Sequence, residues 1–239
     1  QIFRRLNKIP ESFRNCFLSI GFFDGVHLGH RKVLKRLVLN AKRNKVLSLI
    51  ITFDNLAQNV IFNKKEKLIT SINEKIDLLK ILDIDGLFII HFTKRFSKLT
   101  ATKFIDIFIK YFFPKGVVVG EDFHFGTDRK NSNFFLKKIN EKSNFKVIKV
   151  PFLTAANKKI SSSIIKKLIQ EGNIEKANQL LGSIFTLTGK ITKERGIGNK
   201  LFFPTANIKI DKEKITPKGV FFVKIKLKNK TYFGAANIG

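Results

Sequence analysis

The feature that most constrains the fold is an alternation of short apolar runs with stretches of helical period through the first 150 residues. Buried strands are predicted over 17–23, 46–53, 86–92, 116–120 and 145–150. Helices are predicted around 33–41 and over 72–82 and 101–112, where apolar residues recur at helical spacing. Strand–helix alternation of this kind predicts an α/β fold, a Rossmann-like parallel sheet with helices on both faces. Such sheets bind ligands at the carboxyl ends of their strands.

The pattern changes in the last quarter of the chain. Residues 161–181 predict two short helices, with serines at the first cap and Gly172-Asn173 between the helices. Apolar runs then follow over 185–192, 219–227 and 231–235 with no crossover helix between them. This predicts an antiparallel barrel or sheet and a domain boundary near Ser183. The predicted domains are therefore 1–183 and 184–239.

Composition narrows the class of protein. The net charge of +28 invites a nucleic-acid-binding interpretation. However, the chain has only nine arginines against 37 lysines, scattered along its length, whereas recognition of base edges and phosphates favours arginine. The single cysteine, Cys16, cannot form an internal disulfide, which favours a reducing, cytoplasmic setting. No apolar run approaches the roughly 18 residues of a membrane span.

The segment GFFDGVHLGH, residues 21–30, carries the strongest functional signal. It follows a predicted buried strand, precedes a predicted helix and contains two of the four histidines, His27 and His30. Glycines allow close approach of backbone to phosphate, a helix N-terminus favours an anion, and imidazoles can meet developing charge. A capped helix start with solvated imidazoles is the alternative, but the combination with Gly29 and the preceding strand favours nucleotide chemistry.

Five segments in order resemble the prokaryotic bifunctional riboflavin kinase/FAD synthetase (FMN adenylyltransferase) family. They are GFFDGVHLGH at 21–30, VVGEDFHFG at 118–126, ISSSIIK at 160–166, FFPTANI at 202–208 and GAANIG at 234–239. The resemblance implies a nucleotidylyltransferase sheet domain that transfers AMP from MgATP to FMN, giving FAD and pyrophosphate. It also implies a β-barrel module that phosphorylates riboflavin with ATP, giving FMN and ADP.

The resemblance assigns site residues in the first domain. His27 and His30 would contact the phosphates and stabilise the transition state, as catalytic residues. Phe125, with Phe123 beside it, would face the flavin. Packing in the core is an interpretation with at least as much support for either ring. Asp24 is interpreted either as a catalytic residue or as the cap of the turn that follows it. A structural role near the phosphates is favoured. The residues expected to bind ATP are Gly21, Phe23, Asp24, Gly25, Gly29, Asp122, Lys159, Ser161, Ser162, Ser163 and Lys166.

In the second domain the resemblance points to Thr205 and Asn207 as ligands of MgATP. A hydroxyl and an amide oxygen are hard ligands that suit Mg²⁺. A turn at a strand end is the plain alternative for both residues.

The chain departs from the family pattern in several places. TFDNLA at 52–57 stands where the family has a Pro-His-Pro, Asn199 and Phe202 replace an arginine and a glycine, and Lys166 replaces an arginine. The family's kinase module also continues beyond the point where this sequence stops, so the resemblance implies an incomplete barrel in 184–239. We therefore expect weak or no riboflavin kinase activity, with adenylyl transfer retained. The sequence begins at Gln1 and contains no Met, so an initiator residue is missing. With the short kinase module, we expect either a fragment of a longer protein or a degenerate kinase module.

Two alternative functions are compatible with the sequence. A nucleotidylyltransferase for another phosphorylated acceptor would use the same histidines and serines, so these residues do not choose the acceptor. A basic nucleic-acid-binding protein would need neither histidine but would leave the five ordered motifs unexplained. Small-molecule substrates are the expected partners, with no nucleic acid and no membrane; the oligomeric state is open.

Overall fold

The computed structural model describes residues 1–121, 123, 146–155, 158–192 and 205–239. A six-stranded parallel sheet dominates it, in the order β1-β4-β3-β2-β5-β6. Its strands are β1 (Ile2–Phe3), β2 (Phe17–Ile20), β3 (Ser48–Phe53), β4 (Gly86–Ile90), β5 (Gly116–Gly120) and β6 (Lys146–Val150). The predicted parallel α/β sheet is thus confirmed.

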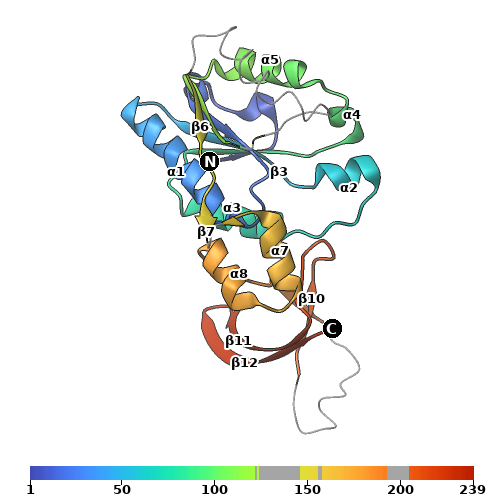
Figure 1. The fold of residues 1–239 in the computed structure, drawn as a ribbon. Coiled ribbons are helices and arrows are strands. Elements are labelled where there is room, and N and C mark those ends of the chain that lie inside the picture. Colours follow the sequence, from blue (N-terminus) through green and yellow to red (C-terminus); the bar gives the residue numbers. More distant parts are fainter. Residues whose placement is uncertain (122, 124–145, 156–157, 193–204) are drawn as a thin grey trace.

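Helices cover both faces of the sheet, as the alternation predicted (Figure 1). They are α1 (Leu28–Arg43), α2 (Ala57–Phe62), α3 (Ile72–Lys80), α4 (Lys94–Ser97) and α5 (Ala101–Phe112). Apolar side chains of α1 and α3 form one core with β2, β3 and β4, including Leu34, Leu37 and Leu79. On the opposite face α5 contributes Phe108 and Phe112 to a second core, which also includes Phe13 from the short 3₁₀ helix at Glu11–Phe13.

The order of the strands sets the location of the site. From β2 the chain moves through β3 to β4 in one direction, and β5 and β6 lie on the other side of β2. The carboxyl end of β2 is therefore a topological switch point, where doubly wound sheets leave a crevice for ligands. The segment 21–30 follows directly from this strand end.

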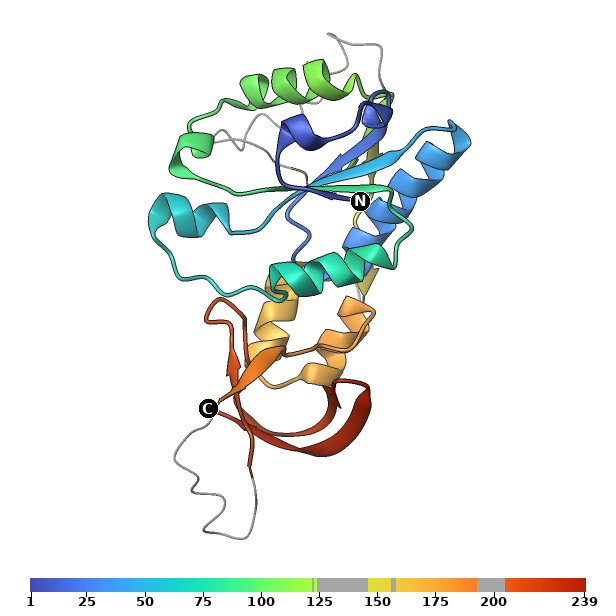
Figure 2. The same ribbon diagram turned by 180° about the vertical axis from the view of Figure 1, so that it is seen from behind.

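Two helices lie between the sheet and the last strands, α7 (Ser162–Gln170) and α8 (Ile174–Leu181) (Figures 1 and 2). The predicted breaks are confirmed, because Ser161 caps α7 and Asn173 caps α8. The helices pack their apolar faces with Ile69 and Ile215 in a third core. Gly182 then ends α8 in the left-handed conformation, with φ 67°, which a glycine adopts without strain.

The C-terminal part contains two antiparallel pairs, β9 (Gly189–Thr192) with β10 (Asn207–Ile210) and β11 (Gly219–Leu227) with β12 (Lys230–Ile238). The strand predicted over 185–192 was wrong for 185–188, since β9 begins only at Gly189. Phe185 packs instead against the α7–α8 core. The strand predicted over 17–23 was too long, because Phe23 adopts a left-handed conformation with φ 53° and belongs to the turn that follows.

Several short elements escaped the sequence pattern. They include β1, β7 (Thr154–Ala155), β8 (Lys158–Lys159), β10, α2, α4 and the 3₁₀ helices η1 (Leu6–Lys8), η2 (Glu11–Phe13) and η3 (Asp24–Val26). Most span two to four residues, too few for the pattern to repeat often enough to identify a helix or a strand.

Candidate functional site

The two histidines of the 21–30 segment lie stacked at the start of α1. His27 is the N-cap residue, and its Nδ1 accepts a hydrogen bond from the backbone N–H of His30 at 3.3 Å. The ring centroids are 3.6 Å apart and the planes differ by 19°. Gly29 makes this possible, because a Cβ at that position would lie 3.1 Å from the His27 ring. The spacing of the motif therefore brings both imidazoles to one helix N-terminus.

Phe23 and Gly21 shape the strand side of this turn. Phe23 is buried and meets His30 edge-on, with ring centroids 5.3 Å apart. A Cβ on Gly21 would lie 2.8 Å from the Phe23 ring, so a side chain at that position would displace it. Gly21 thus has a packing role in the structure, beside the close approach to phosphate that the sequence suggested.

The environment of His30 favours a neutral ring. Burial holds the pKa of His30 well below its ordinary value, and the neighbouring His27 and Lys75 lower that pKa further. Within the described residues, its Nδ1 is buried with no hydrogen-bond partner. A neutral imidazole contributes a directed hydrogen bond to a phosphate oxygen rather than a full charge.

Asp24 is held as a structural clamp of the turn. Its carboxylate accepts hydrogen bonds from the backbone N–H groups of Ile69, at 2.9 Å, and Thr70, at 3.1 Å. The Thr70 hydroxyl in turn accepts from the N–H of Gly25 at 3.0 Å, where φ is 77°. The structure therefore favours the structural role of Asp24 that the sequence left beside a catalytic one.

The start of α7 reaches the same turn. Ser162 Oγ donates to the Asp24 carbonyl oxygen at 3.1 Å, and Lys166 Nζ lies 3.4 Å from the Asp24 carboxylate. Ser161 accepts from the backbone N–H of Ile164 as the helix cap, at 3.4 Å, and Ser163 is exposed. Two helix N-termini, those of α1 and α7, thus converge on Asp24. Helix N-termini offer free N–H groups and a favourable dipole to anions.

Lys159 stands just before that helix, on β8. It is half-buried, and its Nζ lies 5.5 Å from the centre of the Phe152 ring. The next residue, Ile160, lies close to the histidine turn, because a Cβ on Gly29 would come within 3.6 Å of the Ile160 carbonyl oxygen.

Lys75 is a site residue that the sequence analysis missed. It is only 1 % exposed on α3, and its Nζ donates to the carbonyl oxygens of Phe22, at 2.8 Å, and Phe53, at 2.9 Å. The ammonium therefore joins the carboxyl ends of β2 and β3 at the switch point. Burial lowers the pKa of Lys75 to about 8, opposed by the negative charges of Asp24 and Asp54.

Two residues expected at this site lie outside the described residues, Asp122 and Phe125. Phe123 is described; it is half-buried and packs against the core beneath α5. This packing supports the core reading of Phe123.

The residues expected in the second domain lie at the start of β10. Thr205 and Asn207 are both exposed, with Asn207 as the first residue of the strand. Across the described residues, no three His, Cys, Asp or Glu side chains gather in a way that would hold a metal ion. Exposed oxygen ligands of this kind fit an Mg²⁺ that arrives with the phosphates of ATP, since Mg²⁺ keeps waters and few protein ligands.

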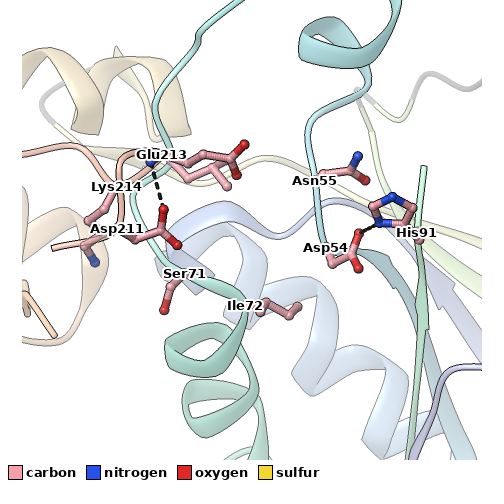
Figure 3. Close-up of a pocket in the computed structure, with 9 residues that line it drawn as sticks. Asp54, Asn55, Ser71, Ile72, His91, Asp211, Glu213 and Lys214 are labelled. Carbon is pink, nitrogen blue, oxygen red and sulfur yellow. Dashed lines mark hydrogen bonds and ion pairs between the residues drawn. The ribbon is translucent and has the colours of Figure 1, made fainter. Parts of the chain in front are cut away.

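A separate cavity of about 340 Å³ lies where the last strands meet the sheet domain (Figure 3). Its wall is rich in acidic groups, and Asp54 is bonded to His91 at 3.0 Å. The lining residues are Asp54, Asn55, Leu68, Ser71, Ile72, His91, Asp211, Glu213 and Lys214. None of the expected site residues belongs to this set. Its carboxylates make it a poor match for a polyphosphate.

Comparison with known proteins matches the chain to two family models. The family model for FAD synthetase matches residues 9–164, and the model for riboflavin kinase matches residues 181–239. A protein of Buchnera aphidicola from Schizaphis graminum, called bifunctional riboflavin kinase/FMN adenylyltransferase, is 39% identical over the whole chain and 78% of its own length. The Escherichia coli K12 protein of the same name is 30% identical over 98% of the chain and 75% of its own length.

Among solved structures, one described as a macrolide-efflux protein from Streptococcus pneumoniae superposes with a TM-score of 0.87. It is 25% identical, and the match covers all of this chain and 78% of that one. Within the described part of the present chain, no helix is long and apolar enough to cross a bilayer.

Proposed function

Because this chain belongs to the bifunctional riboflavin kinase/FMN adenylyltransferase family, we propose that its stacked His27–His30 pair is where AMP passes from ATP to FMN. The family is shown by the matches, and the chain carries a FAD synthetase domain and a riboflavin kinase domain. The assignment of residues to roles is our proposal. The observation that carries it is the convergence of the two histidines with the N-termini of α1 and α7 at the sheet's switch point.

The chemistry requires little beyond position and charge. A phosphate oxygen of FMN attacks the α-phosphorus of ATP; the new P–O bond forms as the bond to the β-phosphate bridging oxygen breaks, and pyrophosphate leaves. The products are FAD and pyrophosphate, and no covalent enzyme intermediate is needed. Catalysis then depends on aligning the two phosphates and on stabilising the charge that develops on their oxygens.

The residues in and around the histidine turn have different roles in this proposal. His27 and His30 contact the phosphate oxygens around the α-phosphorus. Free N–H groups at the start of α7, with the hydroxyls of Ser161, Ser162 and Ser163, bind the β- and γ-phosphates. Lys166 and Lys159 add positive charge nearby, while Gly25 and Asp24 keep the backbone of the turn in place. Asp122 and Phe125 keep their expected roles toward nucleotide and flavin as proposals.

In the kinase domain we propose Thr205 and Asn207 as ligands of MgATP. Mg²⁺ would offset phosphate charge in both reactions. We place the boundary between the domains at 183/184, supported by the left-handed Gly182 and by the start of the riboflavin kinase match at residue 181. The buried Cys16 supports a reducing, cytoplasmic setting.

Purified chain incubated with MgATP and FMN tests the proposal. We expect FAD, separated by chromatography, and its loss in His27→Ala. A matched variant is His91→Ala, since His91 is 69% exposed and paired with Asp54 outside the turn. FAD formation that survives His27→Ala, or a chain that adenylylates nicotinate mononucleotide or phosphopantetheine but not FMN, would overturn it.

A further inference from the structure

The segment 68–70 connects the two domains by backbone hydrogen bonds. The N–H of Leu68 donates to the carbonyl oxygen of Glu213 at 2.6 Å, and the N–H of Ile215 donates to the carbonyl oxygen of Leu68 at 2.8 Å. Leu68 and Lys214 thus form a parallel β-bridge. Residues 213–215 lie within the riboflavin kinase match, and residue 68 lies within the FAD synthetase match.

The same segment holds the histidine turn from its other side. One peptide unit, between Ile69 and Thr70, carries both contacts. Its N–H donates to the Asp24 carboxylate at 3.1 Å, and its carbonyl oxygen accepts from Lys214 Nζ at 2.6 Å. Asp24 stands three residues before His27 in the turn. A chain of direct hydrogen bonds therefore runs from the kinase domain to the adenylyl-transfer turn.

Lys214 is built into this position rather than resting on the surface. It is only 3% exposed, and its Nζ also bonds to Glu74 Oε2 at 2.5 Å. Glu74 completes the capping box of α3 with Ser71, and its other oxygen accepts from Thr188 Oγ1 at 2.9 Å. Figure 3 shows Lys214 beside the acidic wall of the cavity, formed in part by Asp211 and Glu213.

We propose that Lys214 is a positioning residue for adenylyl transfer, supplied to the FAD synthetase site by the riboflavin kinase domain. It fixes the Ile69–Thr70 peptide, which fixes Asp24 and through it the His27–His30 turn. Hydrogen bonds in series polarise one another, so the bond from Lys214 to the Ile69 carbonyl oxygen makes the Thr70 N–H a stronger donor to the Asp24 carboxylate. Removing the ammonium takes away the side-chain donor to the Ile69 carbonyl oxygen. It also leaves the Glu74 carboxylate with the neutral donors of Ser71 and Thr188 in place of a cation, which loosens the segment. This inference rests on the function proposed above.

The test compares two lysines of the same segment in the full chain. Lys214→Met is expected to lower kcat for FAD formation about tenfold or more, with a smaller change in the KM for ATP. Lys212→Met is the control, because this substitution removes the same charge from an exposed lysine two residues away. Lys214→Arg keeps a charged donor and is expected to recover part of kcat. Thermal unfolding followed by circular dichroism checks that each variant is folded.

A double-mutant cycle tests the route. Lys214→Met and Asp24→Asn are expected to be non-additive in kcat if Lys214 acts through Asp24, and additive if it acts only on overall stability. If Lys214→Met does not fold, Glu74→Gln and Lys214→Arg decide in its place: reduced kcat in both supports the proposal, and unchanged kcat in both overturns it.

The outcomes separate this inference from the proposed function. If the unaltered chain makes no FAD from FMN, the proposed function fails first. If the unaltered chain makes FAD and Lys214→Met matches Lys212→Met in kcat and KM, the positioning role is wrong while the function stands.

Discussion

The two domains bury their apolar residues to very different extents. All six residues of β3 are buried between helices in the sheet domain. In β11, by contrast, only Phe221 and Val223 are even half-buried, and Phe222 is 81% exposed, stacked on Phe233. One domain closes its own core, whereas the described residues of the other depend on the sheet domain through Lys214 and Ile215 for buried contacts. The histidine turn therefore lies on a domain with its own closed core, which the second domain contacts through a few buried residues.

The largest expected effect concerns the closed core. Leu49→Ala on β3 removes a side chain with no exposed surface, so we expect a loss of about 2–5 kcal/mol in the free energy of unfolding. Leu227→Ala on β11, where the leucine is 47% exposed, is expected to cost about 0.5 kcal/mol or less. Urea titration of both variants measures the difference. Equal losses would erase the contrast between the domains.

The second effect separates the two reactions. If His30 donates to a phosphate oxygen as proposed, His30→Ala should lower FAD formation from FMN about 100- to 1000-fold, as for removal of one oxyanion donor. Riboflavin phosphorylation, however weak, should keep its rate, because Thr205 and Asn207 are untouched. Assaying both products by chromatography in the same incubation gives the answer. A parallel fall in both rates would contradict two independent sites.

Lys75 provides a test by pH. Its pKa is about 8 in the folded chain, against the ordinary 10.5, so the unfolded chain binds its proton more tightly between these values. Stability therefore rises with pH through this window and falls as pH drops through 8. Relative to Lys75→Met, we expect the free energy of unfolding of the unaltered chain to rise by up to about 3 kcal/mol between pH 7 and pH 10.5. Chemical unfolding at both pH values checks this; a constant difference would mean that Lys75 titrates normally.

The smallest effect concerns the start of α7, beside the histidine turn. Ser161→Ala removes the N-cap of α7, which should cost about 1 kcal/mol of stability. If the start of α7 also binds phosphate, the KM for ATP should rise severalfold with kcat little changed. Steady-state kinetics beside thermal unfolding resolves the two effects. An unchanged KM would limit Ser161 to a role in folding.

Local patterns predicted the parts of the fold that local chemistry determines. The bounds of α5 and β5 were obtained exactly from periodicity and from glycine and proline at their ends. The histidine turn was located because its glycines, strand and helix are neighbours in sequence. The run at 185–188 failed because Phe185 joins the α7–α8 core, a contact that its own neighbours do not encode.

The two buried lysines, Lys75 and Lys214, were not predictable in this way. Lys75 and Lys214 are two of 37 lysines, and nothing beside them in the sequence marks them as buried. Their partners are distant: Phe22 lies 53 residues before Lys75, and Ile69 lies 145 residues before Lys214. Only the folded chain brings those carbonyl oxygens together with an ammonium. The clamp role of Asp24 likewise depends on Ile69 and Thr70, about 45 residues away.

The most direct test of the account follows the α-phosphorus of ATP. The chain is incubated with Mg²⁺, FMN and ATP labelled at that position, and labelled FAD is measured against pyrophosphate released. We predict label in FAD in a one-to-one ratio with pyrophosphate, and loss of both products in His27→Ala. Label that stays in ATP, or that reaches FAD equally fast in His27→Ala, would contradict adenylyl transfer at the histidine turn.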